Sequence, residues 1–364
     1  MEASRSDAPP RRLTLSPGET VADAARKAIA FGAESLLWHQ NAAESGDEEP
    51  LHQLRVSARR LRASIELFSN VIYAAQLKLY RRDIPWFGAQ AGAVRECDVT
   101  AALIGARAAK IDPDLRAAVA PMVAALDQRR KSEHAKLYEL LASKRYRNLI
   151  AKLSRPAIKK IAAGRMLGGV AAQLIRPATH GAARLGKKLG RDAPVLVFHK
   201  LRVRIKRLRY ELEMVAPMGG KRHKKTLARI EALQELLGLY HDVTVASAWL
   251  LSYAETSAAP PRTMLAAGAM IQSLDSRESK LRRRCIRAWR RFERSDAIRD
   301  TLEEIRRAGR LALMPVISPA PDTEKSQSDP SDQSQVARRE LEDAPQSNHN
   351  SMNSQSATET IPTE

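Results

Sequence analysis

Residues 52–62 read HQLRVSARRLR, and residues 199–209 read HKLRVRIKRLR. Seven residues (His, Leu, Arg, Val, Arg, Leu and Arg) recur at the same motif positions at an offset of 147, and Lys206 occupies the position that corresponds to Arg59. A shorter echo pairs Asp98-Val99 with Asp242-Val243 at an offset of 144. Whole motifs that return at a nearly constant offset indicate an internal duplication. We therefore expect two copies of one helical bundle, in residues 17–163 and 167–311.

Both copies of the motif have the periodicity of an amphipathic helix. At ~100° per residue, the apolar residues of each copy form one stripe and the basic residues form a second stripe beside it. The apolar stripes consist of Leu51, Leu54, Ala58, Leu61, Ile65 and Phe68, and of Leu201, Ile205, Leu208, Leu212 and Val215. The first basic row is His52, Arg55, Arg59 and Arg62, and the second basic row is His199, Arg202, Lys206 and Arg209. Each helix should bury its apolar stripe and present its basic row.

The two basic rows have the character of a binding surface. Neither row contains an acidic residue, although like charges one turn apart cost a few tenths of a kcal/mol per pair on an isolated helix. Arginine forks match pairs of phosphate oxygens, so a row of them suits a repeating anion. His52 and His199 lie near the starts of their helices, where the helix dipole favours a neutral imidazole. A capping or packing role is the alternative for each histidine, but its recurrence favours a phosphate contact.

The charge of the chain also indicates a polyanionic partner. The 364 residues carry a net charge of +20. Residues 318–364 have three basic residues against nine acidic ones, which leaves +26 for residues 1–317. DNA, RNA, an anionic membrane surface and a phosphate polymer are all candidates. Aromatic residues make up only 4% of the chain, which weighs against a protein that stacks bases.

The sequence predicts an all-α protein. An Ala-, Leu- and Arg-rich helical pattern extends to about residue 311, and strictly alternating segments are missing. We expect a disordered N-terminus over residues 1–16, a helix that begins with Ser16 as its N-cap, and a helix break at Pro85. Residues 318–364 should form a disordered acidic tail. The two cysteines fit buried thiols, and neither a signal peptide nor a membrane span is visible, so we predict a cytoplasmic location without membrane binding.

The doubled His–Leu–Arg motif, followed in each copy by an Asp-Val pair, resembles the CHAD domain, the conserved histidine α-helical domain. The resemblance covers residues 17–311. It implies two pseudo-symmetric four-helix bundles around a basic surface that binds inorganic polyphosphate through the residues of the two basic rows. It also implies an association with polyphosphate granules. Many relatives are fused to a CYTH domain, but its alternating E-x-E-x-K strand is not found in this sequence.

Eight further basic residues complete the predicted polyphosphate contacts. A plain solvated face is the alternative for several of them, because exposed cations are common on helices. They are Arg60, Arg81, Arg82, His134, Arg207, Lys221, Arg222 and Lys225.

We therefore predict a binding protein that is not an enzyme. Non-specific RNA or DNA binding is the first alternative, and a phosphohydrolase is a weaker one. Phosphoryl transfer needs carboxylates to hold a metal ion and a cradle for the phosphates, and the sequence has neither a Walker motif nor paired acids beside the basic rows. No catalytic residue, metal site or cofactor is predicted.

Overall fold

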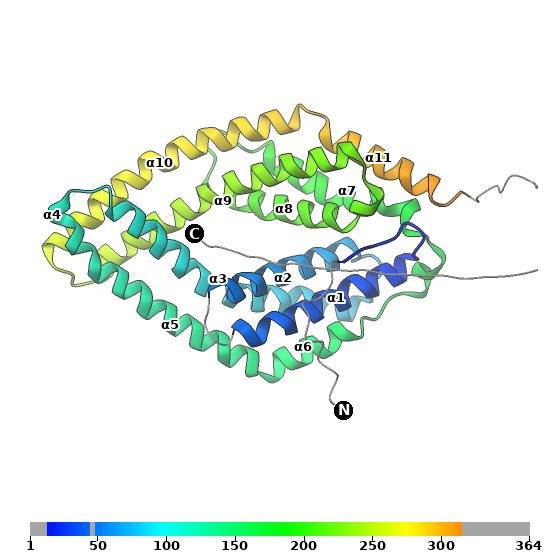
Figure 1. The fold of residues 1–364 in the computed structure, drawn as a ribbon, viewed down its shortest axis with the longest axis horizontal. Coiled ribbons are helices and arrows are strands. Elements are labelled where there is room, and N and C mark those ends of the chain that lie inside the picture. Colours follow the sequence, from blue (N-terminus) through cyan, green and yellow to red (C-terminus); the bar gives the residue numbers. More distant parts are fainter. Residues whose placement is uncertain (1–12, 44–47, 315–364) are drawn as a thin grey trace, which may run out of the picture. The chain divides into compact units, whose positions relative to one another are not determined.

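A computed structural model describes residues 13–43 and 48–314 of the chain (Figure 1). These residues form α-helices joined by short 3₁₀ helices, and no β-strand occurs among them, so the all-α prediction is confirmed. The first segment contains α1 (Val21–Ala43), α2 (Glu48–Leu67), α3 (Ala74–Ala108), α4 (Pro113–Arg116), η1 (Ala117–Val119), α5 (Ala120–Ala142), α6 (Lys144–Ser154) and η2 (Lys160–Gly164). The second contains α7 (Leu167–Gly186), α8 (Val195–Met214), η3 (Ala216–Met218), α9 (Lys221–Thr256), α10 (Pro261–Glu293) and α11 (Ala297–Leu311).

The two segments meet along α2 and α8, which pack against each other (Figure 1). In the first segment α1 covers one side of α2, and α3 lies against α5. In the second, α8 is flanked by α7 and α9, and α10 packs on the outer side of α9. Both segments thus run through two helices of about 20 residues before a long one, as the proposed duplication requires. The duplication itself stays a prediction, as does the division into halves at residues 163 and 167.

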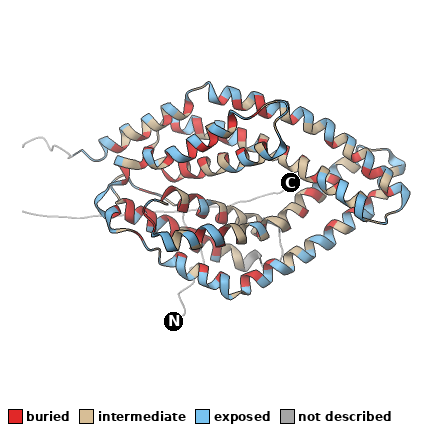
Figure 2. Ribbon diagram, turned by 180° about the vertical axis from the view of Figure 1, so that it is seen from behind, coloured by how far each residue is buried: buried red, intermediate tan, exposed pale blue. Residues whose placement is uncertain are grey.

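The predicted apolar stripes form the centre of the core. Every residue of the α2 stripe is at most 3% exposed, and every residue of the α8 stripe is at most 1% exposed. Burial of such side chains is the main favourable term in folding, at about 1.5–3 kcal/mol for each large one. Figure 2 shows the same division on the outer helices, which carry buried residues on their inner faces and exposed residues outside. Because the stripes are buried, the adjoining basic rows of α2 and α8 are held in fixed directions.

Two predicted helix boundaries are wrong. The first helix begins at Val21 rather than beside Ser16, because Thr20 acts as the cap. The Thr20 hydroxyl accepts from the amide of Asp23 at 3.1 Å and donates to its carboxylate at 2.7 Å, while Ser16 lies in the preceding turn. The predicted helix break at Pro85 does not occur either, since Pro85 lies inside α3. The packing of α3 against its neighbours maintains the helix despite the hydrogen bond that a proline removes.

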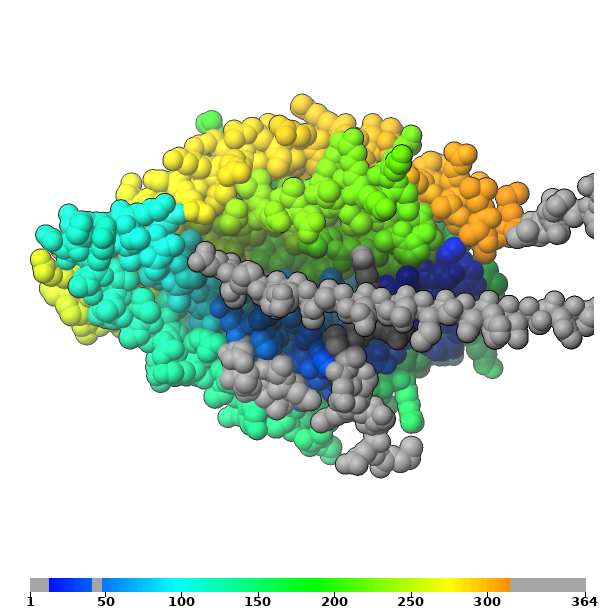
Figure 3. All heavy atoms as spheres, in the orientation of Figure 1, coloured from blue at the N-terminus to red at the C-terminus, as the bar shows by residue number. Residues whose placement is uncertain are grey.

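Several predictions concern residues outside the described ranges. These are residues 1–12 of the predicted loose N-terminus and the acidic tail over residues 318–364, drawn in grey in Figure 3. Within the described part of the N-terminus, Leu15 is fully buried in the core. Cys97 and Cys285 are buried free thiols, as predicted. No helix in the described ranges is both long enough and apolar enough to cross a membrane.

Candidate polyanion-binding cavity

A cavity of about 880 Å³ lies between the two segments, and its walls come from α2, α3, α7 and α8. The packing of α2 against α8 brings the two basic rows to the same cavity. Arg55, Arg59 and Arg62 line it from the first row, and His199, Arg202 and Lys206 line it from the second. Small residues of α2 and α3, among them Ala58, Ala63 and Gly88, leave the space between the long side chains open. Six cationic or ionisable side chains from motifs about 147 residues apart therefore share one site.

The inner basic groups of the cavity are held close together without carboxylate partners. No ion pair joins Arg55, Arg59, Arg62, Arg202 or Lys206 to a carboxylate of the described residues. The Nε atom of Arg202 is buried and has no hydrogen-bond partner among the described residues, which is costly for a charged donor. The Arg59 Nε donates at 3.2 Å to the backbone carbonyl of Arg55, one turn earlier, which leaves its other donors available. Such an arrangement favours an anionic ligand.

Burial and mutual repulsion perturb these groups. Burial, and then the charges of Arg202, Arg59 and Arg55, lower the pKa of Lys206 to about 6. Burial, and then the charges of Arg59 and Arg202, lower the pKa of Arg55 to about 10, so that this guanidinium stays protonated at neutral pH. The charge of Asp242 in α9 opposes the lowering of the Lys206 pKa. Burial raises the pKa of Asp242 itself. In a cluster with more cations than carboxylates the like charges repel each other, and a bound anion would reduce this repulsion.

A histidine pair adjoins the second basic row. The Nδ1 atoms of His199 and His241 lie 3.4 Å apart, and the ring centroids are 5.0 Å apart. Burial, and then the charge of Arg202, lower the pKa of His241 to about 3, and burial lowers the pKa of His199 as well. Both rings are therefore neutral at pH 7 and able to donate one hydrogen bond each. His52 and His199 were predicted to be neutral, and the pKa of each is indeed lowered. Burial is the largest cause of both shifts.

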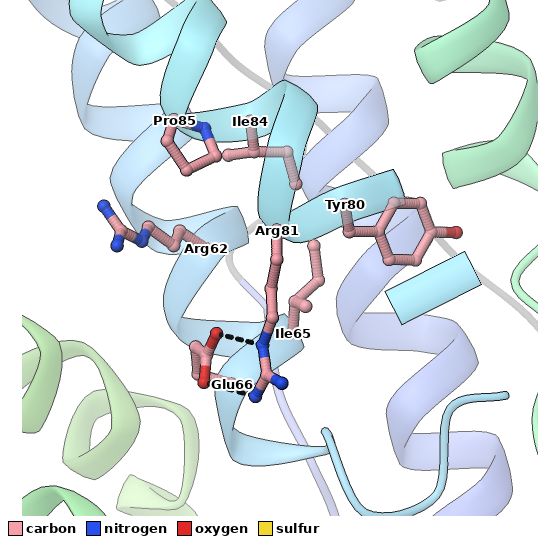
Figure 4. A pocket seen from close by; sticks show the side chains of 7 residues that line it. All are labelled: Arg62, Ile65, Glu66, Tyr80, Arg81, Ile84 and Pro85. Atoms are coloured by element: carbon pink, nitrogen blue, oxygen red, sulfur yellow. Dashed lines mark hydrogen bonds and ion pairs between the residues drawn. The ribbon is translucent and has the colours of Figure 1, made fainter. Parts of the chain in front are cut away.

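Glu66 is the carboxylate that lines the cavity. Glu66 accepts two hydrogen bonds of 3.0 Å each from Arg81, beside a small recess below Pro85 (Figure 4). Arg207 of α8 reaches Glu66 of α2 at 3.3 Å and Glu211 at 2.5 Å. Burial alone would raise the pKa of Glu66, but the hydrogen bond from Arg81 and the charge of Arg207 lower it. Arginines of both segments thus engage the carboxylate of Glu66.

Comparison with known proteins identifies the family of this chain. The sequence model of the CHAD domain matches residues 27–251, which is more than half of the chain. The chain belongs to the CHAD domain family. No curated protein matches it.

Two solved structures share the fold of this CHAD domain. The crystal structure of the CHAD domain from the plant Ricinus communis has a TM-score of 0.63 at 24% identity, and the match covers 78% of this chain and 96% of that one. PptA from Streptomyces chartreusis has a TM-score of 0.60 at 17% identity, with 75% of this chain and 99% of that one covered. At these identities the likeness shows a common fold.

Eight of the predicted contact residues line the cavity of this CHAD domain. Beside the six residues from the basic rows, these are Arg81 and Arg207. The other eight do not line it, namely His52, Arg60, Arg82, His134, Arg209, Lys221, Arg222 and Lys225.

Acidic neighbours explain part of this difference. Arg209, the last residue of the second basic row, donates to Glu213 at 2.7 Å and pairs with Glu231 at 2.8 Å. Arg209 is therefore neutralised, because Glu213 follows it by one turn and Glu231 approaches from α9. Its contact with polyphosphate stays a prediction. Arg60 is 3.7 Å from Glu213 and lies over the ring of Tyr210.

The remaining predicted residues lie elsewhere on the molecule. Arg82 forms two hydrogen bonds of 2.8 Å with the adjacent Asp83, and His134 belongs to α5 on the outer side of α3. Lys221, Arg222 and Lys225 are exposed in the first turns of α9, away from the α8 face that lines the cavity. The structure does not bring these three residues to the cavity, because a charge run in the sequence does not reveal which helix face it joins. Their contact with polyphosphate stays a prediction.

The structure adds cavity residues that the sequence analysis missed. Arg184 of α7 and the α8 residues Lys200 and Arg204 line the cavity, and His241 supports it from α9. Lys200 and Arg204 lie inside the second motif, so a wider reading of its basic face could have found them. His241 directly precedes Asp242 in the echoed Asp-Val segment. Arg184 belongs to no repeated motif, and only tertiary packing identifies it.

Replacement of Arg207 by alanine should destabilise the protein most at high pH. Glu211 is fully buried, one of its oxygens has no hydrogen-bond partner among the described residues, and burial raises its pKa to about 7. Because this pKa lies above the unfolded value, the folded state is favoured in acid and loses stability as pH rises through about 7. Without Arg207 the charged carboxylate is unpaired. We expect a loss of about 2 kcal/mol in the free energy of unfolding at pH 8 and less than about 1 kcal/mol at pH 5.

Urea unfolding of both proteins at the two pH values measures this difference. Arg81→Ala is the matched control, because it removes another hydrogen-bond donor to Glu66 from a side chain that is 51% exposed. It should cost less than about 1 kcal/mol at either pH. A loss for Arg207→Ala that is equal at pH 5 and pH 8 would contradict the assigned role of Glu211.

Proposed function

We propose that this CHAD domain binds inorganic polyphosphate in the cavity between its two segments. The observation that carries the proposal is the meeting of the two basic rows, with unpaired guanidinium groups of Arg55, Arg59 and Arg202 directed to one cavity. Guanidinium forks bind phosphate oxygens in pairs, and several of them along a cavity suit a chain of phosphates better than a single small anion. The polyphosphate-binding role that the family resemblance implies supports the same ligand.

The aromatic content favours polyphosphate over nucleic acid. The cavity lining contains one aromatic side chain, that of Tyr210, whereas single-stranded nucleic acids are held largely by base stacking on such rings. The rest of the lining consists mainly of arginine, lysine and small apolar residues. These groups contact phosphates and offer few ways to distinguish bases. Affinity should therefore depend on phosphate charge and fall steeply with salt concentration, as for other dense phosphate polymers.

We further propose that binding occurs without chemical conversion, at polyphosphate granules in the cytoplasm. The carboxylates at the cavity are Glu66, engaged by Arg81 and Arg207, and Asp242, surrounded by cations. In the described residues no three His, Cys, Asp or Glu side chains are grouped so that they could hold a metal ion. A phosphate-release assay with added Mg²⁺ or Mn²⁺ tests this part, since sustained release of phosphate would contradict it.

Calorimetric titration with long-chain polyphosphate tests the binding proposal. The variant Arg59→Gln/Arg202→Gln removes one central guanidinium from each row. We expect about a hundredfold loss of affinity, because a hydrogen bond to a charged group contributes about 1.5–3 kcal/mol. Removal of the buried, unpaired Arg202 should not unfold the protein, and thermal unfolding verifies this. Arg59→Gln alone provides a milder variant.

A control with the same loss of charge separates the cavity from net charge. Arg26→Gln/Arg299→Gln removes two exposed cations that pair with Asp23 and Asp296 on other helices. It should bind within about twofold of the wild type. Equal weakening in both double variants would show that overall charge is responsible. Preference for transfer RNA over polyphosphate in a competition experiment would overturn the choice of ligand.

A further inference from the structure

The outer face of α10 carries a second set of cations, remote from the cavity. Residues 280–294 include seven exposed basic side chains, which we call the α10 ridge: Lys280, Arg283, Arg284, Arg287, Arg290, Arg291 and Arg294. At ~100° per residue they fall within an arc of roughly 120°. Glu293, the one acidic residue in this stretch, falls outside that arc. The ridge extends over about 21 Å, given a rise of ~1.5 Å per residue.

The opposite face of α10 explains why the ridge points outward. Leu281, Cys285, Trp289 and Phe292 are at most 8% exposed and face the core beside α9. Arg282 also turns inward, where it pairs with Glu278 and lies over the ring of Phe198. The outer face of α10 is pale blue in Figure 2, and its atoms border the molecule in Figure 3. No residue of α10 lines the cavity between the segments.

The ridge differs from ordinary charged helix surfaces of this protein. On other helices exposed cations pair with carboxylates three or four residues away, as Arg26 does with Asp23, Lys131 with Asp127 and Arg299 with Asp296. None of the seven ridge residues forms an ion pair within the described ranges. Like charges at these spacings repel each other and weaken the helix. A row of this kind is expected where a polyanion neutralises it.

The neighbouring side chains restrict the kind of partner. A helix that binds a membrane surface inserts exposed apolar residues beside its cations, but Ile286, Trp289 and Phe292 of α10 are buried. A surface for single-stranded nucleic acid needs exposed aromatic rings, and the ridge has none. It also has no Asn, Gln, Ser or Thr within its arc that could contact base edges in a duplex groove. The ridge therefore offers contacts to phosphate groups, and none to bases or to the interior of a membrane.

We propose that the α10 ridge is a second contact surface for long-chain polyphosphate, independent of the central cavity. This inference rests on the proposed function of the cavity and extends it. A polymer held in the cavity of one molecule can be bound by the ridge of the same molecule or of another. With two surfaces the protein is bivalent for long chains and monovalent for chains that are too short to engage both. Bivalent binding raises the affinity for long chains and connects protein molecules along the polymer.

The test compares tripolyphosphate with chains of several hundred phosphates. The ridge variant Arg284→Gln/Arg287→Gln/Arg291→Gln removes three central cations and leaves the buried face of α10 intact. Its control, Arg26→Gln/Lys131→Gln/Arg299→Gln, removes the same charge from paired positions on other helices. Calorimetry at about 0.15 M salt measures both affinities, and light scattering with long chains measures the connection of protein molecules.

The ridge variant should bind tripolyphosphate within twofold of the wild type. It should bind long chains about tenfold more weakly and show less light scattering with them. The control should match the wild type in all three measurements. Equal behaviour of the ridge variant and the control toward long chains would overturn the inference. So would a ridge variant that loses duplex RNA or DNA binding and keeps its binding of long polyphosphate. Failure of the cavity proposal is visible separately, as tripolyphosphate affinity that Arg59→Gln/Arg202→Gln does not change.

Discussion

The affinity of the cavity for polyphosphate should fall about tenfold between pH 7 and pH 8, because Lys206 takes up a proton when the polymer binds. In the free protein, burial and the charges of Arg202, Arg59 and Arg55 hold the pKa of Lys206 near 6. The amine is therefore mostly neutral at pH 7. A phosphate chain in the cavity offsets the repulsion and raises this pKa. Between the two pKa values binding consumes about one proton, so affinity falls as pH rises.

Calorimetry in two buffers with different heats of ionisation measures the proton uptake directly. The wild type should take up about one proton per binding event at pH 7.5 and close to none at pH 5, where Lys206 is already charged. Internal phosphates of a long chain do not titrate in this range, so the proton must come to the protein.

Lys206→Arg is the variant that separates this effect from the loss of a contact. Arginine keeps the positive charge at every pH of interest, so the variant should bind at pH 8 at least as tightly as the wild type, with little dependence on pH. Lys206→Met should also lack the proton uptake, but it should bind more weakly than the wild type at pH 6. Uptake that persists in Lys206→Arg would assign the titration to the neighbouring pair His199 and His241, and would contradict the role given to Lys206.

Gly309→Ala should lower the free energy of unfolding by about 3 kcal/mol. Gly309 of α11 and Gly168 of α7 are in backbone contact, and a Cβ atom at position 309 would lie 2.0 Å from the carbonyl oxygen of Gly168. A backbone oxygen cannot rotate away as the end of a side chain can, so α11 would have to separate from α7. The displacement would also disturb Glu304 of α11, which accepts a 2.8 Å hydrogen bond from the amide of His223 at the start of α9.

Chemical denaturation and hydrogen exchange test this prediction. The amides of α11 and of the first turn of α9 should lose protection in Gly309→Ala before the rest of the protein does. Gly238→Ala is the matched control, because its Cβ atom would meet no atom within 4 Å. It should raise the free energy of unfolding by about 0.5–1 kcal/mol, as alanine does in a helix. Equal stability of Gly309→Ala and the wild type would contradict the prediction, because it would show that α7 and α11 can separate at little cost in free energy.

Local periodicity was sufficient to predict the helices and the faces of α2 and α8. Leu54 and Leu201 are fully buried, and Arg55 and Arg202 adjoin them on the cavity side, as the spacing of the two motifs requires. A helix turns by a constant angle per residue, so neighbours along its surface follow from the sequence alone. The capping by Thr20 and the continuous helix at Pro85 were missed, because competing caps and tertiary packing outweighed the local signals.

Residue patterns alone were enough to predict an all-α chain with two His–Leu–Arg helices, a strong positive charge and a CHAD-like motif. The folded chain was needed to show that α2 and α8 lie together, that Arg184 and Arg204 join the same cavity, and that Arg209 is neutralised by Glu213 and Glu231. Contacts between residues about 150 positions apart depend on how whole helices pack, which no local pattern specifies. The lowered pKa of Lys206 has the same origin, because desolvation and repulsion by Arg55 and Arg59 exist only once the two segments enclose the cavity.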